Sequence, residues 1–462
     1  MFYTLDWIII GLYCIGIILL ATYVSRKKVG SERTAEDYFL AGRSLPWWAI
    51  GASLIAANIS AEQIIGMSGQ GFVVGMAIAV WELTAAIALI VMAKFFLPLF
   101  LEKKIYTMPQ FLEQRFDKRV SLVLSFFWLT VYIFVNLTAV LWLGSLAINT
   151  LTGMSLVNGM IILAFLSLAY SLSGGLKAVA MTDIVQVILL IFGGLAVSYI
   201  ALTIIGDGNI ATGMVQVYQQ IPEKFDMILS PDNPSYNNLP GIWILIGAGV
   251  WIGHFAYWGF NQYITQRALG GKSLKEAQKG VMFAAYLKLL MPLVIVLPGI
   301  CAAILFPVLD KTDQAYPTMM IELLPSGLLG LTFAALIAAI VSSLASLTNS
   351  ISTIFTMDIC RSFSKNEIQQ PSLILIGRIT VVGSMLIALV MAKPILGNSD
   401  QIFQYIQNFT GLFTPGILVI FLVALFWKKA TTLSVLVAAI LSVVMSILIQ
   451  ASFPDFPYIH RM

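Results

Sequence analysis

Residues 51–69, GASLIAANISAEQIIGMSG, place several polar side chains inside an apolar stretch long enough to cross a membrane. Polar groups that face lipid are costly, so these side chains must face protein or water. Unwound backbone at this depth is tolerated only where it lines a cavity, and glycine lets the backbone unwind. The stretch therefore predicts a broken membrane helix beside a cavity. The alternative is an intact helix whose small and polar residues pack against neighbouring helices. The polar residues are Ser53, Asn58, Ser60, Glu62 and Gln63.

The composition of the whole chain is that of a polytopic membrane protein. Of its 462 residues, 59% are hydrophobic and 10% are charged, against roughly 45–50% and about 25% in soluble domains. The net charge of +4 and the lack of a long basic run argue against nucleic acid as a partner. The three cysteines, Cys14, Cys301 and Cys360, show neither a disulfide framework nor metal-ligand spacing.

Twelve apolar windows are long enough to span a bilayer, which predicts an all-α polytopic membrane protein. The first window has no basic segment before it and no cleavage site after it, so we expect a helix that is retained. The windows lie at about 5–24, 47–69, 75–100, 120–150, 156–172, 178–206, 240–260, 278–308, 327–359, 371–393, 402–427 and 431–452.

Positive charge is distributed unevenly between the two ends of these windows. With the N-terminus outside, the inner loops hold most of the 26 Lys and Arg residues, Arg267 among them. Basic residues near membrane helices concentrate on the cytoplasmic side. We therefore expect a multi-pass protein of the cell membrane (plasma or inner membrane) with an outside N-terminus, surrounded by the lipid bilayer.

A second glycine-rich interruption lies at 241–260, GIWILIGAGVWIGHFAYWGF, which also holds His254 and the pair Tyr257–Trp258. If the first window is an extra helix, the two interrupted windows are helices 1 and 6 of a ten-helix core. They then occupy matching positions in two five-helix halves of opposite orientation. This pattern is typical of inverted-repeat secondary transporters, whose binding site lies at the breaks.

The inverted repeat divides the chain into five parts. We expect an extra N-terminal helix and inner loop at 1–46, and at least one further helix after the core. The remaining parts are the first five-helix repeat at 47–206, an external loop at 207–239, the second repeat at 240–427, and the C-terminal helix and tail at 428–462.

Four ionisable residues lie within the expected helices and far from either end: Glu62, Glu82, Asp183 and Lys288. Such residues pair with one another or face a cavity, because an isolated charge at the bilayer centre is costly. Glu82 and Lys288 supply an acceptor and a donor suited to a polyhydroxylated solute, although a plain structural ion pair is the alternative. Asp183 could equally serve packing near the inner end of its helix.

Two further pairs are candidates for binding. Ser342 and Ser343 are adjacent and point in different directions, so both could reach one cation only beside the free carbonyls of a broken helix. Serine is also common between packed membrane helices. Gln407 and Phe403 lie one turn apart on one helix face, where an amide could bond a sugar hydroxyl and a ring could stack on it. An aromatic residue at this spacing is more often part of the core.

Five segments of the sequence are long and specific enough to compare with known proteins, and they resemble the sodium/solute symporter family, in particular its sodium-coupled sugar transporters. The resemblance implies the inverted-repeat, LeuT-type fold described above. The segments are EDYFLAGRSLPWWAIGASLIAANISAEQ (36–63), YWGFNQYITQR (257–267), YLKLLMPLVIVLPGI (286–300), AALIAAIVSSLASLTNSISTIFTMDI (334–359) and FQYIQNFTG (403–411).

The resemblance also implies roles for individual residues. A solute site, a set of gates and a sodium site each map onto positions of this chain, and Asp183 matches an acidic residue on the route by which sodium leaves. The solute site comprises Asn58, Gln63, Glu82, His254, Lys288 and Gln407; the gates are Met67, Phe403, Tyr257 and Trp258. The sodium ligands are the carbonyls of Ala56, Ile59 and Ala339 and the hydroxyls of Ser342 and Ser343.

The chain departs from the sugar-transporting relatives where specificity would be determined. The galactose-transporting member that the chain resembles has Asn at the position of His254, Ser at that of Ala85, and Tyr at those of Ala256 and Trp81. A site built to bond a hydroxyl discriminates strongly against solutes that lack it. The sodium site is therefore better supported than the identity of the sugar.

The residues and the resemblance together predict sodium-coupled import of a galactose- or glucose-type hexose by alternating access. The alternative is sodium-coupled uptake of another small polar solute such as myo-inositol. A channel would need a continuous polar stripe, whereas these polar groups cluster at mid-depth. We expect no enzyme activity, because no cofactor motif or activated nucleophile is present. Na⁺ and the sugar are the expected ligands, with one Na⁺ per sugar.

Overall fold

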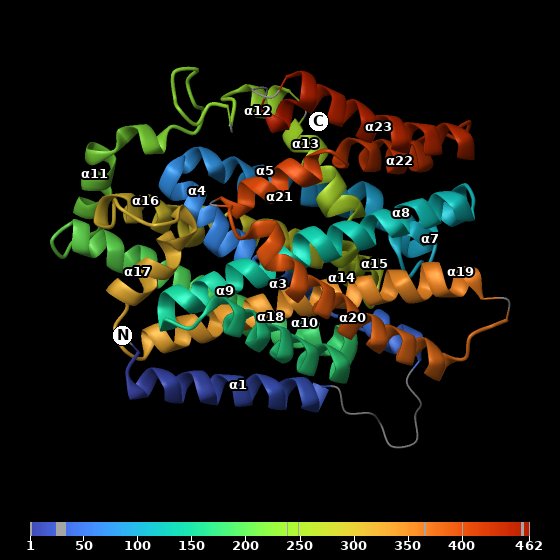
Figure 1. The fold of residues 1–462 in the computed structure, drawn as a ribbon, viewed down its shortest axis with the longest axis horizontal. Coiled ribbons are helices and arrows are strands. Elements are labelled where there is room, and N and C mark those ends of the chain that lie inside the picture. Colours follow the sequence, from blue (N-terminus) through green and yellow to red (C-terminus); the bar gives the residue numbers. More distant parts are fainter. Residues whose placement is uncertain are drawn as a thin grey trace.

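The computed structural model describes residues 2–24, 34–237, 239–247, 249–364, 366–399, 401–453 and 457–461, with side chains omitted at 170, 172–175 and 458. Within this part of the chain every regular element is a helix, and the sole β-pairing is an isolated bridge between Leu45 and Gly271. Most long helices run along the length of the molecule (Figure 1). The expectation of an all-α membrane protein is confirmed.

Ten of the twelve expected windows correspond to helices or bent helix pairs that are long and apolar enough to cross a membrane. Seven are single runs: Thr4–Val24 (α1), Met76–Glu102 (including α5, Val80–Val91, and α6, Leu97–Glu102), Lys118–Thr152 (α8, Lys118–Val131, and α9, Thr138–Thr152), Leu176–Ile205 (within α10, Leu156–Ile205), Leu328–Phe363 (α18, Leu328–Ile354, and α19, Arg361–Phe363), Gln370–Leu396 (α20) and Thr432–Ser452 (α23).

Three further spans are pairs of helices joined at a sharp bend. The angle is 59° between Trp47–Asn58 (α3) and Glu62–Val73, whose last turns are α4 (Ser68–Val73). The bend predicted from residues 51–69 is thereby confirmed. Two bends were not predicted. They are 40° between Leu274–Lys288 (α15) and Pro292–Leu305 (ending in α16, Leu297–Leu305), and 48° between Ile402–Gly411 (α21) and Thr414–Phe426 (α22).

The window at 240–260 is interrupted, as expected. It consists of α12 (Trp243–Ile246), α13 (Gly249–His254) and a π-helical turn at Phe255–Phe260. At Asn261 the backbone turns to an extended conformation, and the Asn261 side chain accepts from Tyr263 N to begin α14 (Gln262–Leu269).

The windows at 156–172 and 178–206 both fall within α10, which folds back on itself. A Cβ on Gly144 would lie 2.7 Å from Leu163 Cδ1 and 2.8 Å from Ile340 Cγ2, so Leu163 lies beside Ile340. Asp183 accepts a hydrogen bond from Ser342, only two residues further along α18. A straight helix would separate Leu163 from Asp183 by about 30 Å, so the two arms of α10 run side by side along α18.

The core lies around α18, whose span is 83% buried, whereas the spans of α1 and α23 are 6% and 11% buried. The N-terminal and C-terminal helices are therefore peripheral, as the extra helices of an inverted-repeat core should be. α1 is fixed by Asp6, whose carboxylate accepts from Gly327 N at 2.7 Å and Gly330 N at 2.9 Å at the start of α18. The carboxylate thus caps the helix that forms the centre of the molecule.

The segment 207–239 forms α11 (Ile210–Gln220) and a short 3₁₀ turn at Pro222–Phe225. Lys224 in this turn donates to the carbonyl of Phe72 at 3.0 Å and to that of Val73, at the end of α4. Partial burial lowers the pKa of the Lys224 ammonium. Gly75 has φ +88°, and a Cβ there would lie 2.3 Å from Lys224 O, so only glycine allows this approach. The segment thus seals the end of the broken helix.

Candidate functional site

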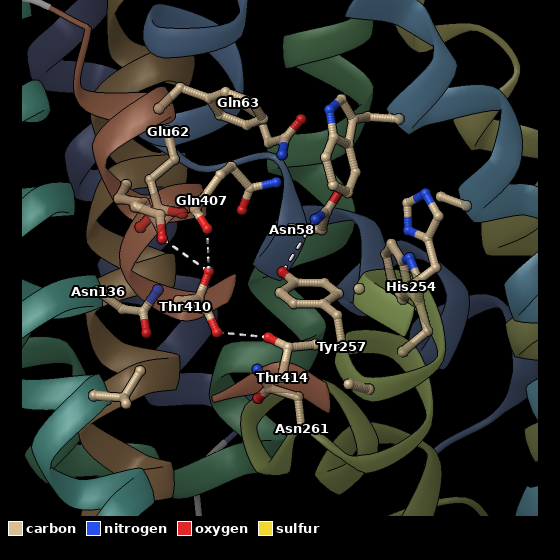
Figure 2. A pocket seen from close by; sticks show the side chains of 18 of the residues that line it. Asn58, Glu62, Gln63, Asn136, His254, Tyr257, Asn261, Gln407, Thr410 and Thr414 are labelled. Atoms are coloured by element: carbon tan, nitrogen blue, oxygen red, sulfur yellow. Dashed lines mark hydrogen bonds between the residues drawn. The ribbon is translucent and has the colours of Figure 1, made fainter. Parts of the chain in front are cut away.

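A cavity lies where the broken segments meet, between the ends of α3 and α15, the π-helical turn after α13, and helices α5, α8 and α21. All six residues predicted to bind the solute line it: Asn58, Gln63, Glu82, His254, Lys288 and Gln407. Three of the four predicted gate residues line it as well: Tyr257, Trp258 and Phe403. Figure 2 shows Asn58, Gln63, Tyr257, His254 and Gln407 converging from several helices, with His254 and Gln407 on opposite sides of the space.

Lys288 and Glu82 form a buried ion pair at one side of this cavity. Lys288 Nζ donates to Glu82 Oε2 at 2.6 Å, and the two side chains are 1% and 2% exposed. The ammonium also lies 5.4 Å from the centre of the Trp258 ring, which favours a cation on its face. Lys288 is the last residue of α15 before the bend, so the bend brings the charge to the cavity wall.

His254 is held by a residue that the sequence analysis did not identify. Its Nε2 lies 2.7 Å from Thr84 Oγ1, and the Thr84 hydroxyl donates to Val80 O at 2.5 Å. Because the Thr84 proton is committed to that carbonyl, Nε2 is the donor and Nδ1 remains an acceptor. The ring also packs edge-on against Trp81 at 5.3 Å. Positions 81 and 254, two of those at which we expect the chain to depart from the galactose-transporting member it resembles, are therefore in direct contact.

A chain of hydroxyl groups lies beneath the cavity. Asn58 Nδ2 donates to Tyr257 Oη at 3.1 Å (Figure 2), and Tyr257 Oη lies 2.5 Å from Tyr263 Oη. Beside it, Tyr132 Oη donates to Asn261 Oδ1 at 2.6 Å. The phenol of Tyr257 thus connects the end of α3 to α14.

The cavity has a second polar side that the sequence analysis missed. Glu62, which was noted only as an intramembrane acid, lines it together with Asn136. Thr410 and Thr414 continue this side along α21 and α22 (Figure 2). Isolated polar residues in apolar windows gave no signal of their own, because their meeting depends on the folded chain.

Two acceptors at the cavity have no hydrogen-bond partner among the described residues, namely Asn58 Oδ1 and Gln63 Oε1. A buried acceptor left without a donor is costly, at about 1–3 kcal/mol. With Glu62 and Glu82 also present, the cavity offers many acceptors and needs a ligand that brings several donors.

The outer side of the cavity is closed by packing and by one loop. Phe403 lies against the broken helix, since a Cβ on Gly66 would lie 3.0 Å from Phe403 Cβ. Met67, the fourth predicted gate residue, is fully buried and is not among the described residues that line the cavity.

The loop at Thr312–Gln314 ties the outer ends together. Asp313 Oδ2 accepts from Ile402 N at 3.1 Å, at the start of α21, and Lys311 Nζ donates to Ser399 O at 3.0 Å. Gln70 Nε2 on α4 donates to Gln401 Oε1 at 2.8 Å. Helix α21 is thus held to both the loop and the outer half of the broken helix.

The break in the first core helix releases the two carbonyls predicted to bind sodium. In a continuous helix Ser60 N would bond Ala56 O, and Gln63 N would bond Ile59 O. Here Ser60 N bonds Asn58 O at 2.8 Å and Gln63 N bonds Ser60 O at 3.1 Å. Hard cations prefer such oxygens.

The other predicted sodium ligands lie on α18, which packs directly against α3. Ala339, Ser342 and Ser343 are all buried there. The hydroxyl of Ser343 has no hydrogen-bond partner among the described residues. The hydroxyl of Ser342 donates to Asp183, which leaves its lone pairs for another ligand.

Asp183 is a centre of contacts between helices. It accepts from Ser53 Oγ at 2.5 Å and from Ser342, and Arg267 Nη2 lies 3.8 Å from its Oδ2. Arg267, which was counted with the inner loops, lies in α14, and its side chain is 1% exposed. Its guanidinium donates to Ser53 at 2.7 Å and to Ser346. These partners, which are distant from Arg267 in the sequence, stabilise its positive charge inside the protein.

Broken helices that surround a mid-depth cavity, with released carbonyls beside buried hydroxyls, define a secondary transporter of the inverted-repeat class. The match to a family model agrees with this class and narrows it. The model of the sodium:solute symporter family matches residues 38–433. The chain belongs to the sodium:solute symporter family.

Individual relatives support the same placement. The chain is 47% identical to a sodium/glucose cotransporter of Vibrio parahaemolyticus, over 99% of this chain and 87% of that protein. It is 31% identical to human sodium/myo-inositol cotransporter 2 over 86% of this chain, and the match spans 62% of the human protein. A solved structure of a Na⁺-coupled sialic acid symporter in an outward-open state has a TM-score of 0.86 at 22% identity, covering 100% of this chain and 94% of that one. That likeness confirms the inverted-repeat fold.

Proposed function

We propose that the protein imports a hexose of the galactose or glucose type together with Na⁺, by alternating access. The observation that carries this proposal is the cavity that joins Glu82, Lys288 and the unpaired amide oxygens of Asn58 and Gln63. A polyhydroxylated ring can donate to several of these acceptors and accept from the ammonium. The name of the Vibrio relative, a sodium/glucose cotransporter, supports this class of solute.

In this proposal the six cavity residues bind the solute, and the sodium ion binds between α3 and α18. Its ligands are the carbonyls of Ala56, Ile59 and Ala339 and the hydroxyls of Ser342 and Ser343. Met67 and Phe403 close the outer side, and Tyr257 with Trp258 closes the inner side. Asp183 lies on the path by which the ion leaves.

The driving force is sufficient for this task. A membrane potential of about 100 mV supplies roughly 2.3 kcal/mol per Na⁺, and a tenfold Na⁺ gradient adds about 1.4 kcal/mol. One Na⁺ per sugar could therefore sustain an accumulation of a few hundredfold.

The outside N-terminus and the five-part division of the chain belong to the same proposal.

Myo-inositol is the second candidate solute. Its support is the contact of His254 with Thr84 and Trp81, because positions 254 and 81 are two of those at which we expect the chain to depart from the galactose-transporting member it resembles. The human relative named as a sodium/myo-inositol cotransporter shows that the family includes proteins named for this solute.

The test is uptake of labelled galactose, glucose and myo-inositol by proteoliposomes, with an inward gradient of Na⁺ or of K⁺. We expect one of the two hexoses to accumulate with Na⁺ alone, and Ser343→Ala to weaken the Na⁺ dependence. Ser384→Ala is the matched control, because Ser384 bonds only to its own helix at Val381 O. Accumulation of myo-inositol but of neither hexose would favour the second candidate, and equal uptake with K⁺ would refute sodium coupling.

A further inference from the structure

A second, apolar cavity lies outside the central one, between α8, α22 and α23, with α7 (Met108–Arg115) at one end. Its lining is almost entirely aliphatic and aromatic, for example Leu124, Ile420 and Ala439, with Ser442 as its polar member. We call it the α8–α23 groove. These helices lie together at one side of the molecule (Figure 1). Side chains at its edge, such as Ile440, are largely exposed, so the groove opens toward the membrane.

One end of the groove has a concentration of positive charge. Leu112 and Val120 mark this end, which lies where α7 ends, α8 begins, α22 ends and α23 begins. The basic residues in these turns outnumber the acidic ones, which are Glu113 and Asp117. The basic residues are Arg115, Lys118, Arg119, Lys428 and Lys429.

Three of these cations are available to an outside ligand. The Arg119 side chain is 81% exposed and meets Asp117 only at 3.5 Å, and Lys428 and Lys429 are exposed. The other two are partly engaged with the protein. Arg115 donates to the carbonyls of Ala424, Trp427 and Lys428, and Lys118 donates to that of Ser362.

We propose that the α8–α23 groove binds one anionic phospholipid. Its acyl chain would lie along the aliphatic lining, and its phosphate headgroup would meet Arg119, Lys428 and Lys429. Each cation near an anionic headgroup contributes favourable binding energy, so the charges favour an anionic over a zwitterionic lipid. The apolar lining alone would bind the acyl chains of both lipids equally.

The groove and the central cavity share a wall. Phe127 and Ile417 belong to this wall, because each of them lines both spaces. Helix α22, which carries Ile417, is the second half of a bent pair. A bound acyl chain therefore packs against the rear of the wall that encloses the solute. The proposal concerns lipid binding and does not depend on which solute is carried.

The test is native mass spectrometry of the full chain, extracted from bilayers that contain equal amounts of phosphatidylglycerol and phosphatidylcholine with identical acyl chains. We expect one phosphatidylglycerol to be retained in preference to phosphatidylcholine. The variant R119Q/K428Q/K429Q should lower the retained ratio by about tenfold or more. Ala439→Phe, which fills the groove and keeps every charge, should lower retention of both lipids.

The matched control is K272Q/K275Q/K279Q, which removes three exposed charges near the start of α15, a helix that does not line the groove. Its retained ratio should equal that of the wild type. Equal retention of the two lipids by the wild type would overturn the proposal. The same loss in both triple variants, or a protein dimer without lipid, would also overturn it.

Discussion

Glu82 and Lys288 have almost no exposure to water, so each charge depends on the other. Removing one partner of a buried pair typically costs 3–5 kcal/mol, because the remaining charge is left uncompensated. We expect Glu82→Gln and Lys288→Met each to lower the free energy of unfolding by about this amount. The double variant should recover most of the loss, but it should remain unable to take up the solute.

Thermal unfolding in detergent and uptake in proteoliposomes measure the two effects separately. Lys94→Gln is the control, because Lys94 is exposed beside the Phe95 ring and should change neither. A double variant that still transports would show that the pair is purely structural.

The imidazole of His254 offers one acceptor, Nδ1, where we expect the galactose-transporting member that the chain resembles to have an amide. We expect His254→Asn to change the ratio of uptake among galactose, glucose and myo-inositol by about tenfold or more, because an amide both donates and accepts. The Na⁺ concentration for half-maximal uptake should stay the same. An unchanged ratio would exclude this residue as a determinant of specificity.

At the scale of elements, the loop at Thr312–Gln314 packs closely against α4, the second half of the broken helix. A Cβ on Gly69 would lie 2.8 Å from Asp313 Oδ1 and 2.9 Å from Thr312 O. We expect Gly69→Ala to displace this loop and weaken its hold on α21, which favours an open outer side. A cysteine at Phe403, in a background without the three native cysteines, should then react several-fold faster with a membrane-impermeant maleimide.

Gly383→Ala is the matched control for that experiment, because nothing lies within 4 Å of its added Cβ. An unchanged rate in Gly69→Ala would mean that the loop does not restrain α21.

The break after α3 and the hydroxyls of α18 form the predicted ion site together. Ser343→Ala removes one of five oxygens, so we expect the Na⁺ concentration for half-maximal uptake to rise by about tenfold, roughly 1.4 kcal/mol. Isotope uptake against Na⁺ concentration measures this, with Ser384→Ala unchanged. A normal Na⁺ response in Ser343→Ala would remove the hydroxyl from the site.

Most elements could be predicted from the sequence because apolar length and glycine clusters are local signals. The bend at 58–62 follows from the polar residues within one window, and the interruption at 241–260 follows from its glycines. The bends next to Pro292 and Pro415 were missed, although proline inside a helix removes a backbone donor. Averaging hydropathy over a whole window hides a single residue of this kind.

The site was predicted less completely than the fold, because its missing members depend on distant partners. Arg267 follows an apolar window closely and was therefore assigned to a loop. Its buried position depends on Ser53, Asp183 and Ser346, which no local pattern connects to it. Thr84 and Asn136 were missed for the same reason, since each acquires its role only when another helix supplies His254 or Glu62.

At the scale of the whole molecule, orientation and stoichiometry can be measured together with transport. If the N-terminus is outside, a cysteine replacing Lys311 should react with an impermeant maleimide added to intact cells, and one replacing Lys272 should react only after lysis. The reverse pattern would invert the proposed topology.

One predicted oxygen cage favours one Na⁺ per sugar. The reversal potential of solute flux, measured in vesicles with fixed gradients, should therefore fit a one-to-one ratio. A fit to two ions per sugar would require a second ion site.

The short break between Asn58 and Glu62 frees Ala56 O and Ile59 O and also positions Asn58 and Gln63 at the cavity. In the proposed function, one backbone shape therefore serves both ligands. If a bound ion holds the backbone in this shape, the solute loses less conformational entropy of the protein when it binds. A bound solute favours ion binding in the same way. Such reciprocity is required by thermodynamics: the factor by which Na⁺ tightens sugar binding equals the factor by which sugar tightens Na⁺ binding. A sodium gradient would then fill the sugar site selectively on the side where the ion is abundant, and empty it on the other.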